Sequence, residues 1–165
     1  MPDLSIRIKK KTDGAAALSC TRADGSTTWQ RQEGQLGRFF PLHDLTHYAV
    51  ETVLGFKRAF YGLLAEGWDI TRFGEPGMSG QLPEEATLAE VLVAFFDVER
   101  ATGTQASAED FNWKIETYYD EHATPTPTFR MTDDQLHRIR ALRADLFARW
   151  HAVQPGGSLE LSFDR

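Results

Sequence analysis

The sequence predicts an α+β domain in which a small antiparallel sheet packs against about four helices. Apolar and polar residues alternate near both ends of the chain, as they do in half-buried strands. Between these ends, apolar residues recur at intervals of three and four, as they do in amphipathic helices. With 165 residues, 41% of them hydrophobic and 25% charged, the chain is expected to form a single domain over residues 1–165.

The N-terminal segment is expected to form a three-stranded meander. Residues 4–10 alternate between apolar and polar, and Asp-Gly pairs at 13–14 and 24–25 separate the strand-like runs 16–22 and 27–32. An Asp-Gly pair favours a tight hairpin turn because glycine adopts a positive φ at no steric cost. The sheet would therefore begin with three consecutive antiparallel strands.

A fourth strand is expected at the C-terminal end, where residues 159–163 alternate in the same way. We expect this strand to pair with the N-terminal strand. In that arrangement the outward Arg7 and Lys9 would face the outward Glu160 and Asp164, since opposite charges on neighbouring strands attract.

Four helices are expected between the meander and the last strand. They cover residues 42–66, a segment opened by Pro83, residues 107–122, and a segment that begins at Thr132. Three acidic residues of the second helix are interpreted as a solvated face rather than a paired-acid site, and four late arginines as a solvated surface. These seven residues are Glu90, Asp97 and Glu99, and Arg138, Arg140, Arg143 and Arg149.

Composition excludes several classes of function. A net charge of −6 argues against a nucleic-acid binder, which needs clustered cations. The longest apolar run, residues 91–96, is far too short to span a bilayer, and no hydrophobic leader follows the start, so a cytoplasmic location is expected. The only cysteine, Cys20, excludes an intrachain disulfide and cysteine-rich zinc ribbons, and we expect it on a buried strand face.

The pattern in the chain that most clearly suggests a chemical function consists of His43, His47 and Glu51. At about 100° per residue they fall at roughly 0°, 40° and 80° around a helix, nearly opposite the apolar face. Two histidines four residues apart project side by side and can chelate one divalent ion such as zinc. The pattern therefore predicts a metal site with His43 and His47 as ligands, and a metal-dependent hydrolase as one function.

The stretch from His43 to His47 resembles the His-Glu-x-x-His helix of zinc hydrolases over five residues. Asp44 stands where those enzymes have the glutamate that polarises water, and it is one methylene shorter. The His-Asp pair also resembles that of the HD phosphohydrolases, but these need an upstream histidine and His43 is the first in this chain. The chain is assigned to neither family.

Asp44 and Glu51 are the candidate catalytic residues, as base or orienting group. Glu51 lies about 12 Å along the helix from His43, too far for both to bind one ion without strain, so it would orient His47 or pair with Arg58. Further ligands are expected on the third or fourth helix, and the sequence leaves five candidates open. These are Glu116, Asp120, His122, Asp134 and His137.

Two functions remain open at this level. In the metal-dependent hydrolase, the glycine-rich segment 67–82 would close as a lid over a small-molecule substrate. The alternative is a non-catalytic interaction module for a protein partner, which could be a homodimer. Its contact surface would include Val50, Leu54 and Tyr61, the apolar residues that share the histidine side of the helix.

Overall fold

The computed structural model describes residues 1–165 and confirms the α+β class, with a four-stranded antiparallel sheet and five α-helices. The strands are β1 (Leu4–Lys10), β2 (Ala16–Arg22), β3 (Thr27–Gln32) and β4 (Ser158–Phe163). The helices are α1 (Leu36–Leu54), α2 (Phe60–Glu66), α3 (Glu84–Thr102), α4 (Ala108–Glu121) and α5 (Asp133–Ala152). Two short 3-10 helices, η1 (Ile70–Gly74) and η2 (Met78–Gln81), lie within the segment expected to be a long loop.

The strand order is β3-β2-β1-β4, so the expected pairing between the first and last strands is confirmed. Arg7 lies directly opposite Glu160 and binds its carboxylate, with 2.7 Å between Nη2 and Oε1. Lys9 is opposite Ser158, and Asp164 follows the end of β4. The expected contact between Lys9 and Asp164 is therefore wrong, because the two strands run antiparallel and those two residues fall at opposite ends of the pairing.

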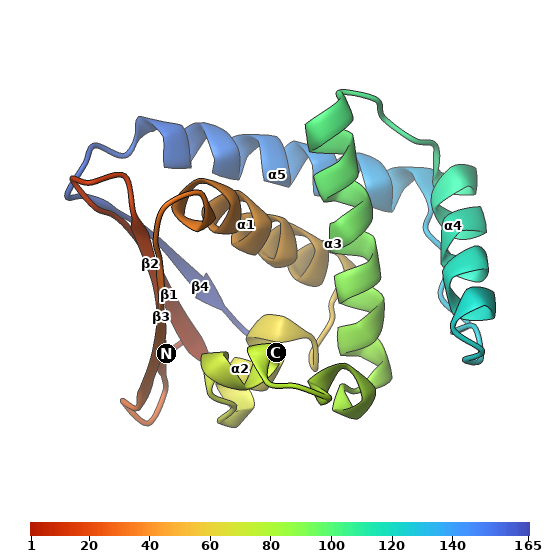
Figure 1. Ribbon diagram of the computed structural model, residues 1–165, viewed down its shortest axis with the longest axis horizontal. Helices are drawn as coiled ribbons and strands as arrows, with labels where there is room; N and C mark the ends of the chain where they lie inside the picture. Colours follow the sequence, from red (N-terminus) through yellow and green to blue (C-terminus); the bar gives the residue numbers. More distant parts are fainter.

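The helices lie on one side of the sheet (Figure 1). Helix α1 packs on the sheet and is itself contacted by α3 and α5, while α4 packs outside α3. The core fills the space between the sheet and the helices, and its strand residues include Ile6, Leu18 and the single cysteine, Cys20. Cys20 is fully buried, as expected. The site described below lies where α3 crosses α1.

The expected helix over residues 42–66 is in fact two helices, α1 and α2. Gly55 ends α1 in the left-handed conformation, with φ of 69°, and Gly62 lets α2 pass close to the preceding turn. The apolar spacing continues through the break because Phe56 and Phe60 both pack against the core from the turn and from α2. A glycine within an otherwise helical pattern gave too weak a signal to predict this reversal.

Arg143 and Arg140 correct the expectation that the late arginines are solvated. The buried Arg143 donates from Nε to Thr46 on α1 and from Nη2 to the carbonyl of Phe96 on α3. Arg140 binds the buried carboxylate of Glu99. A buried guanidinium needs several hydrogen-bond acceptors at once. Because the acceptors of these two arginines lie on or beside α1 and α3, their side chains hold α5 against those helices.

No helix combines the length and the apolar character needed to cross a lipid bilayer. The expected cytoplasmic location stays a prediction.

Candidate metal centre

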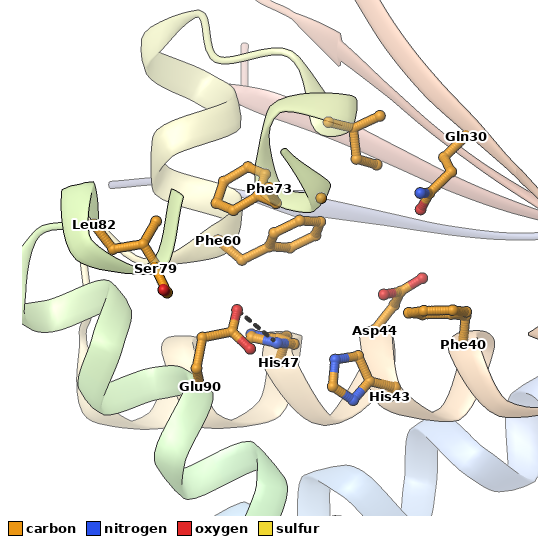
Figure 2. A pocket seen from close by; sticks show the side chains of 12 residues that line it. Gln30, Phe40, His43, Asp44, His47, Phe60, Phe73, Ser79, Leu82 and Glu90 are labelled. Atoms are coloured by element: carbon orange, nitrogen blue, oxygen red, sulfur yellow. Dashed lines mark ion pairs between the residues drawn. The ribbon is translucent and has the colours of Figure 1, made fainter. Parts of the chain in front are cut away.

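Three potential ligands meet where α3 crosses α1 (Figure 2). His43 and His47 lie one turn apart on α1, and Glu90 reaches them from α3. One ligand atom from each residue lies within 4.8 Å of the others. His47 Nε2 is 3.4 Å from Glu90 Oε1. The structure therefore brings together both histidines predicted as ligands and adds a carboxylate.

His47 is held between two carboxylates. Its Nδ1 lies 3.1 Å from Glu51 Oε1, and its Nε2 faces Glu90. Burial opposes the charged form of the imidazole, but Glu90 and Glu51 outweigh it and raise the pKa of His47 well above its ordinary value. Burial also acts to raise the pKa of Glu90, yet the neighbouring His47 holds that pKa below its ordinary value. The imidazole of His47 thus lies between a buried carboxylate, that of Glu51, and a partly exposed one, that of Glu90.

Glu51 fixes both His47 and the start of α2. Its Oε1 accepts the N–H of Phe60 at 3.0 Å and its Oε2 accepts that of Tyr61 at 2.9 Å. These are free N–H groups of the first turn of α2, which a carboxylate satisfies well. Burial raises the pKa of Glu51, although His47 and the N–H of Tyr61 act against it. With its oxygens taken, Glu51 is placed to orient His47 rather than to act as a base.

His43 has a matching partner on α3. Its Nδ1 lies 2.7 Å from Asp97 Oδ2, which leaves Nε2 as the ring nitrogen without a hydrogen-bond partner. Each histidine therefore has a carboxylate on Nδ1, Asp97 for His43 and Glu51 for His47. Metal-binding histidines usually donate the N–H of the second ring nitrogen to a carboxylate, a backbone carbonyl or water, which fixes the ring and makes the other nitrogen a better ligand.

The His43, His47 and Glu51 side of α1, predicted to lie opposite the apolar face, is covered by the rest of the chain and borders a cavity. His47 is only 2% exposed and Glu51 is fully buried. The helical pattern identified the side of α1 that packs on the sheet, but α2 and α3 cover the opposite side. The acidic face of α3 is likewise not a solvated surface, since Glu90, Asp97 and Glu99 each bind a cationic or imidazole partner.

The spacing of the three groups suits a small divalent ion. Zinc binds histidine nitrogen and carboxylate oxygen at about 2.0 to 2.2 Å, so tetrahedral ligands lie about 3.3 to 3.5 Å apart. The distance between His47 Nε2 and Glu90 Oε1 already matches this separation. His43 can complete the set by a small ring movement, because all three ligand atoms are within 4.8 Å.

A cavity of about 380 Å³ opens beside the three potential ligands. Its volume is typical of small-molecule sites. Figure 2 shows Phe60 and Phe73 side by side in the lining, facing the histidines and Glu90, and the ring of Phe60 packs against that of His47 with centroids 5.3 Å apart. Apart from the ligands and Asp44, the lining contains no charged side chain. It comprises Gln30, Phe40, His43, Asp44, His47, Phe60, Ile70, Phe73, Gly74, Ser79, Leu82 and Glu90.

Asp44 lines this cavity next to His43. Its Oδ2 accepts a hydrogen bond of 2.8 Å from Gln32 Nε2 on β3. Burial raises the pKa of Asp44 to about 6, although the hydrogen bond from Gln32 and the nearby His43 act to lower it. A carboxylate with a pKa close to neutral pH can both accept and return a proton, as a general base must.

The third ligand comes from α3, not from the later helices that the sequence suggested. None of Glu116, Asp120, His122, Asp134 and His137 belongs to the group around His43 and His47. Sequence reasoning missed Glu90 because it treated the acids of α3 as solvated. A signal was present, since Glu90 and Asp97 are seven residues apart and so lie on one side of a helix.

Two of the three apolar residues beside the histidines are unavailable as a contact surface, whereas Leu54 is partly exposed. Val50 and Tyr61 are fully buried within the chain, and neither they nor Leu54 line the cavity. The Tyr61 hydroxyl donates to the carbonyl of Asp44 at 2.9 Å, which ties α2 to the same turn of α1 that carries the site. The expectation that Val50 and Tyr61 form a contact surface is therefore wrong, while the interaction module itself stays a prediction.

Comparison with known proteins adds no relative to this description: no protein family, no curated protein and no solved structure matches the chain.

Proposed function

We propose that the protein binds one divalent metal ion, zinc being the best fit, through His43, His47 and Glu90. The observation that carries this proposal is the paired orientation of the histidines. Each has a carboxylate on Nδ1, while the group that they form with Glu90 borders a cavity. A structural ion pair would need His47 and its two glutamates but not the His43–Asp97 contact on the same border.

We propose further that the bound ion serves hydrolysis. Catalytic zinc sites commonly have three protein ligands, including two histidines and a glutamate, and keep one position open. Such an ion lowers the pKa of water and polarises a carbonyl group. The cavity beside the ligands gives a substrate access to that position, and Asp44 lies in its wall as the base.

Zinc titration of chelator-treated protein tests the binding proposal. We expect one zinc ion per wild-type chain by isothermal titration calorimetry, and affinity at least tenfold lower in His43→Ala and Glu90→Gln. Glu90 is partly exposed, with 41% of its side chain accessible, so the isosteric Glu90→Gln change should leave the fold intact. His137→Ala is the matched control, because this exposed histidine lies outside the group. Equal affinity in all four proteins would contradict the proposal.

Asp44→Asn tests the hydrolytic proposal separately. We expect this variant to bind zinc like the wild type but to hydrolyse p-nitrophenyl acetate about 100-fold or more slowly, because a positioned base contributes about 10² to 10⁴ to the rate. Asparagine can still accept the hydrogen bond from Gln32, so the wall of the cavity is retained. Equal turnover by both zinc-loaded proteins would exclude Asp44 as the base.

A further inference from the structure

We infer that the substrate of this site is an uncharged ester or amide with a compact aromatic or branched apolar group, and not a phosphate ester or other anion. The inference rests on the proposed function and specifies the substrate class. Two independent properties of the cavity lead to it, namely the charge of its lining and the position of its apolar wall.

The charge of the site disfavours anions. No lysine or arginine lines the cavity. Asp44 and Glu90 stand in its wall, while Glu51 and Asp97 stand behind the two histidines. Four carboxylates thus outweigh the two positive charges of one divalent ion.

Arg100, which approaches the carboxylate of Asp97 behind His43, also lies outside the cavity lining. Arg100 Nη2 is 3.9 Å from Asp97 Oδ1, and Arg143 donates elsewhere, to Thr46 and Phe96. Sites that transfer phosphoryl groups normally surround the phosphate with arginine, lysine or additional metal ions. This site offers no such group, so a phosphate ester would meet carboxylates instead of cations.

The apolar wall of the cavity would recognise the apolar group of the substrate. Phe60 from α2 and Phe73 from η1 meet edge to face, with ring centroids 4.9 Å apart, and Phe60 also packs against the ring of His47, with centroids 5.3 Å apart (Figure 2). Ile70, Leu82 and Phe40 are the other hydrophobic side chains of the lining. A carbonyl group placed at the ion would direct its acyl substituent onto these rings. The volume of about 380 Å³ suits a benzoyl-sized group rather than a polypeptide segment.

The reaction is balanced by the groups present. The oxygen of one water molecule bonds to the carbonyl carbon, and the C–O or C–N bond to the leaving group breaks. Asp44 takes a proton from the water and returns it to the leaving oxygen or nitrogen. The products are a carboxylic acid and an alcohol or amine, and the acid then loses the second proton of the water to solvent or to the amine and becomes a carboxylate. The carboxylate product is an anion, so the same lining that disfavours anionic substrates favours its release.

Binding of three small probes to the zinc-loaded protein tests the inference without an activity assay. By calorimetry at pH 7 we expect benzohydroxamic acid, which is uncharged in solution and aromatic, to bind at least tenfold more tightly than acetohydroxamic acid or phenylphosphonate. Phe73→Ala should remove the preference for benzohydroxamic acid while leaving the affinities for zinc and acetohydroxamic acid unchanged. Trp113→Ala is the control, since this exposed tryptophan lies on α4, away from the cavity.

A second variant tests the charge argument on a residue whose change should not disturb folding. Ser79 is an exposed residue of η2 at the cavity wall, and Ser79→Lys adds a cation there. We expect it to increase the affinity for phenylphosphonate several-fold. If the protein binds zinc but then binds the three probes with equal affinity, or binds phenylphosphonate most tightly, this inference alone is overturned. Failure to bind zinc overturns the proposed function and the inference together.

Discussion

Individual side chains in this protein serve the site and the fold to different degrees, and Asp97 and Glu51 illustrate the difference. Asp97 contacts His43, and its second oxygen has no hydrogen-bond partner. Glu51 contacts His47 and also accepts two backbone N–H groups of α2. Substitution should therefore separate metal affinity from stability.

Asp97→Asn is expected to weaken zinc binding by about 10- to 100-fold, the usual effect of removing such a histidine partner, with little change in melting temperature. Glu51→Gln is expected to weaken zinc binding similarly and also to lower the free energy of unfolding by about 1 to 3 kcal/mol. The neutral amide has only one acceptor oxygen for the N–H groups of Phe60 and Tyr61 and for His47. Zinc titration and urea denaturation of both variants measure the two effects. Equal loss of stability in the two variants would contradict this assignment.

The buried thiol of Cys20 is expected to make the protein less stable as the pH rises into the alkaline range. Burial raises the pKa of its thiol from 9.0 to about 12, with Asp44 adding to the effect and Arg22 opposing it. Above about pH 9 the unfolded thiol ionises while the folded thiol does not, so the unfolded state gains and stability falls as pH rises towards 12. Between about pH 8.5 and 10 we expect the wild type to lose about 1 kcal/mol more stability than Cys20→Ala. Denaturant titrations at the two pH values measure this difference, and parallel losses in both proteins would refute it.

At the scale of elements, the site depends on how closely α2 returns to α1. Gly62 makes this return possible, since a Cβ there would lie 1.9 Å from the carbonyl oxygen of Lys57. That approach brings the N–H groups of Phe60 and Tyr61 onto Glu51, and Glu51 in turn fixes His47. The position of a metal ligand is thus linked to a glycine in the neighbouring helix.

Gly62→Ala is expected to destabilise the protein by about 1 to 3 kcal/mol or more, because the backbone must shift to admit the methyl group. The shift should also weaken zinc binding through Glu51. Gly80→Ala is the matched control, since a Cβ at Gly80 meets no atom within 4 Å and its φ is not positive. Thermal unfolding and zinc titration compare the two. If Gly62→Ala behaved like Gly80→Ala, the close approach would have no energetic importance.

The sequence predicted those elements of the fold whose patterns are local. Alternating residues and two Asp-Gly pairs were sufficient for the meander, and the pairing of β1 with β4 followed from matched strands at the two ends. The break at Gly55 was not predicted, because Phe56 and Phe60 happen to continue the helical spacing. When the chain reverses direction but the spacing of apolar residues continues unchanged, that spacing cannot reveal the reversal.

Only the part of the site that depends on a local sequence pattern was predicted. His43 and His47 lie four apart on one helix, so their proximity is a local property. Glu90 and Asp97 meet them only because α3 crosses α1 over the side opposite the sheet, and such a crossing depends on packing throughout the core. Glu51 was correctly placed beside His47, but its bonds to Phe60 and Tyr61 required the turn that the sequence did not predict.

For the whole molecule, β3, α1, α2, η1, η2 and α3 together line an open cavity that combines potential metal ligands with aromatic rings. A crystal structure of the zinc-soaked protein, with anomalous data at the zinc edge, tests this arrangement most directly. We predict one strong anomalous peak about 2.0 to 2.2 Å from a ring nitrogen of His43, a ring nitrogen of His47 and a carboxylate oxygen of Glu90. A saturated crystal with no peak there, or with zinc bound only elsewhere, would contradict the proposal that these three residues form a metal centre.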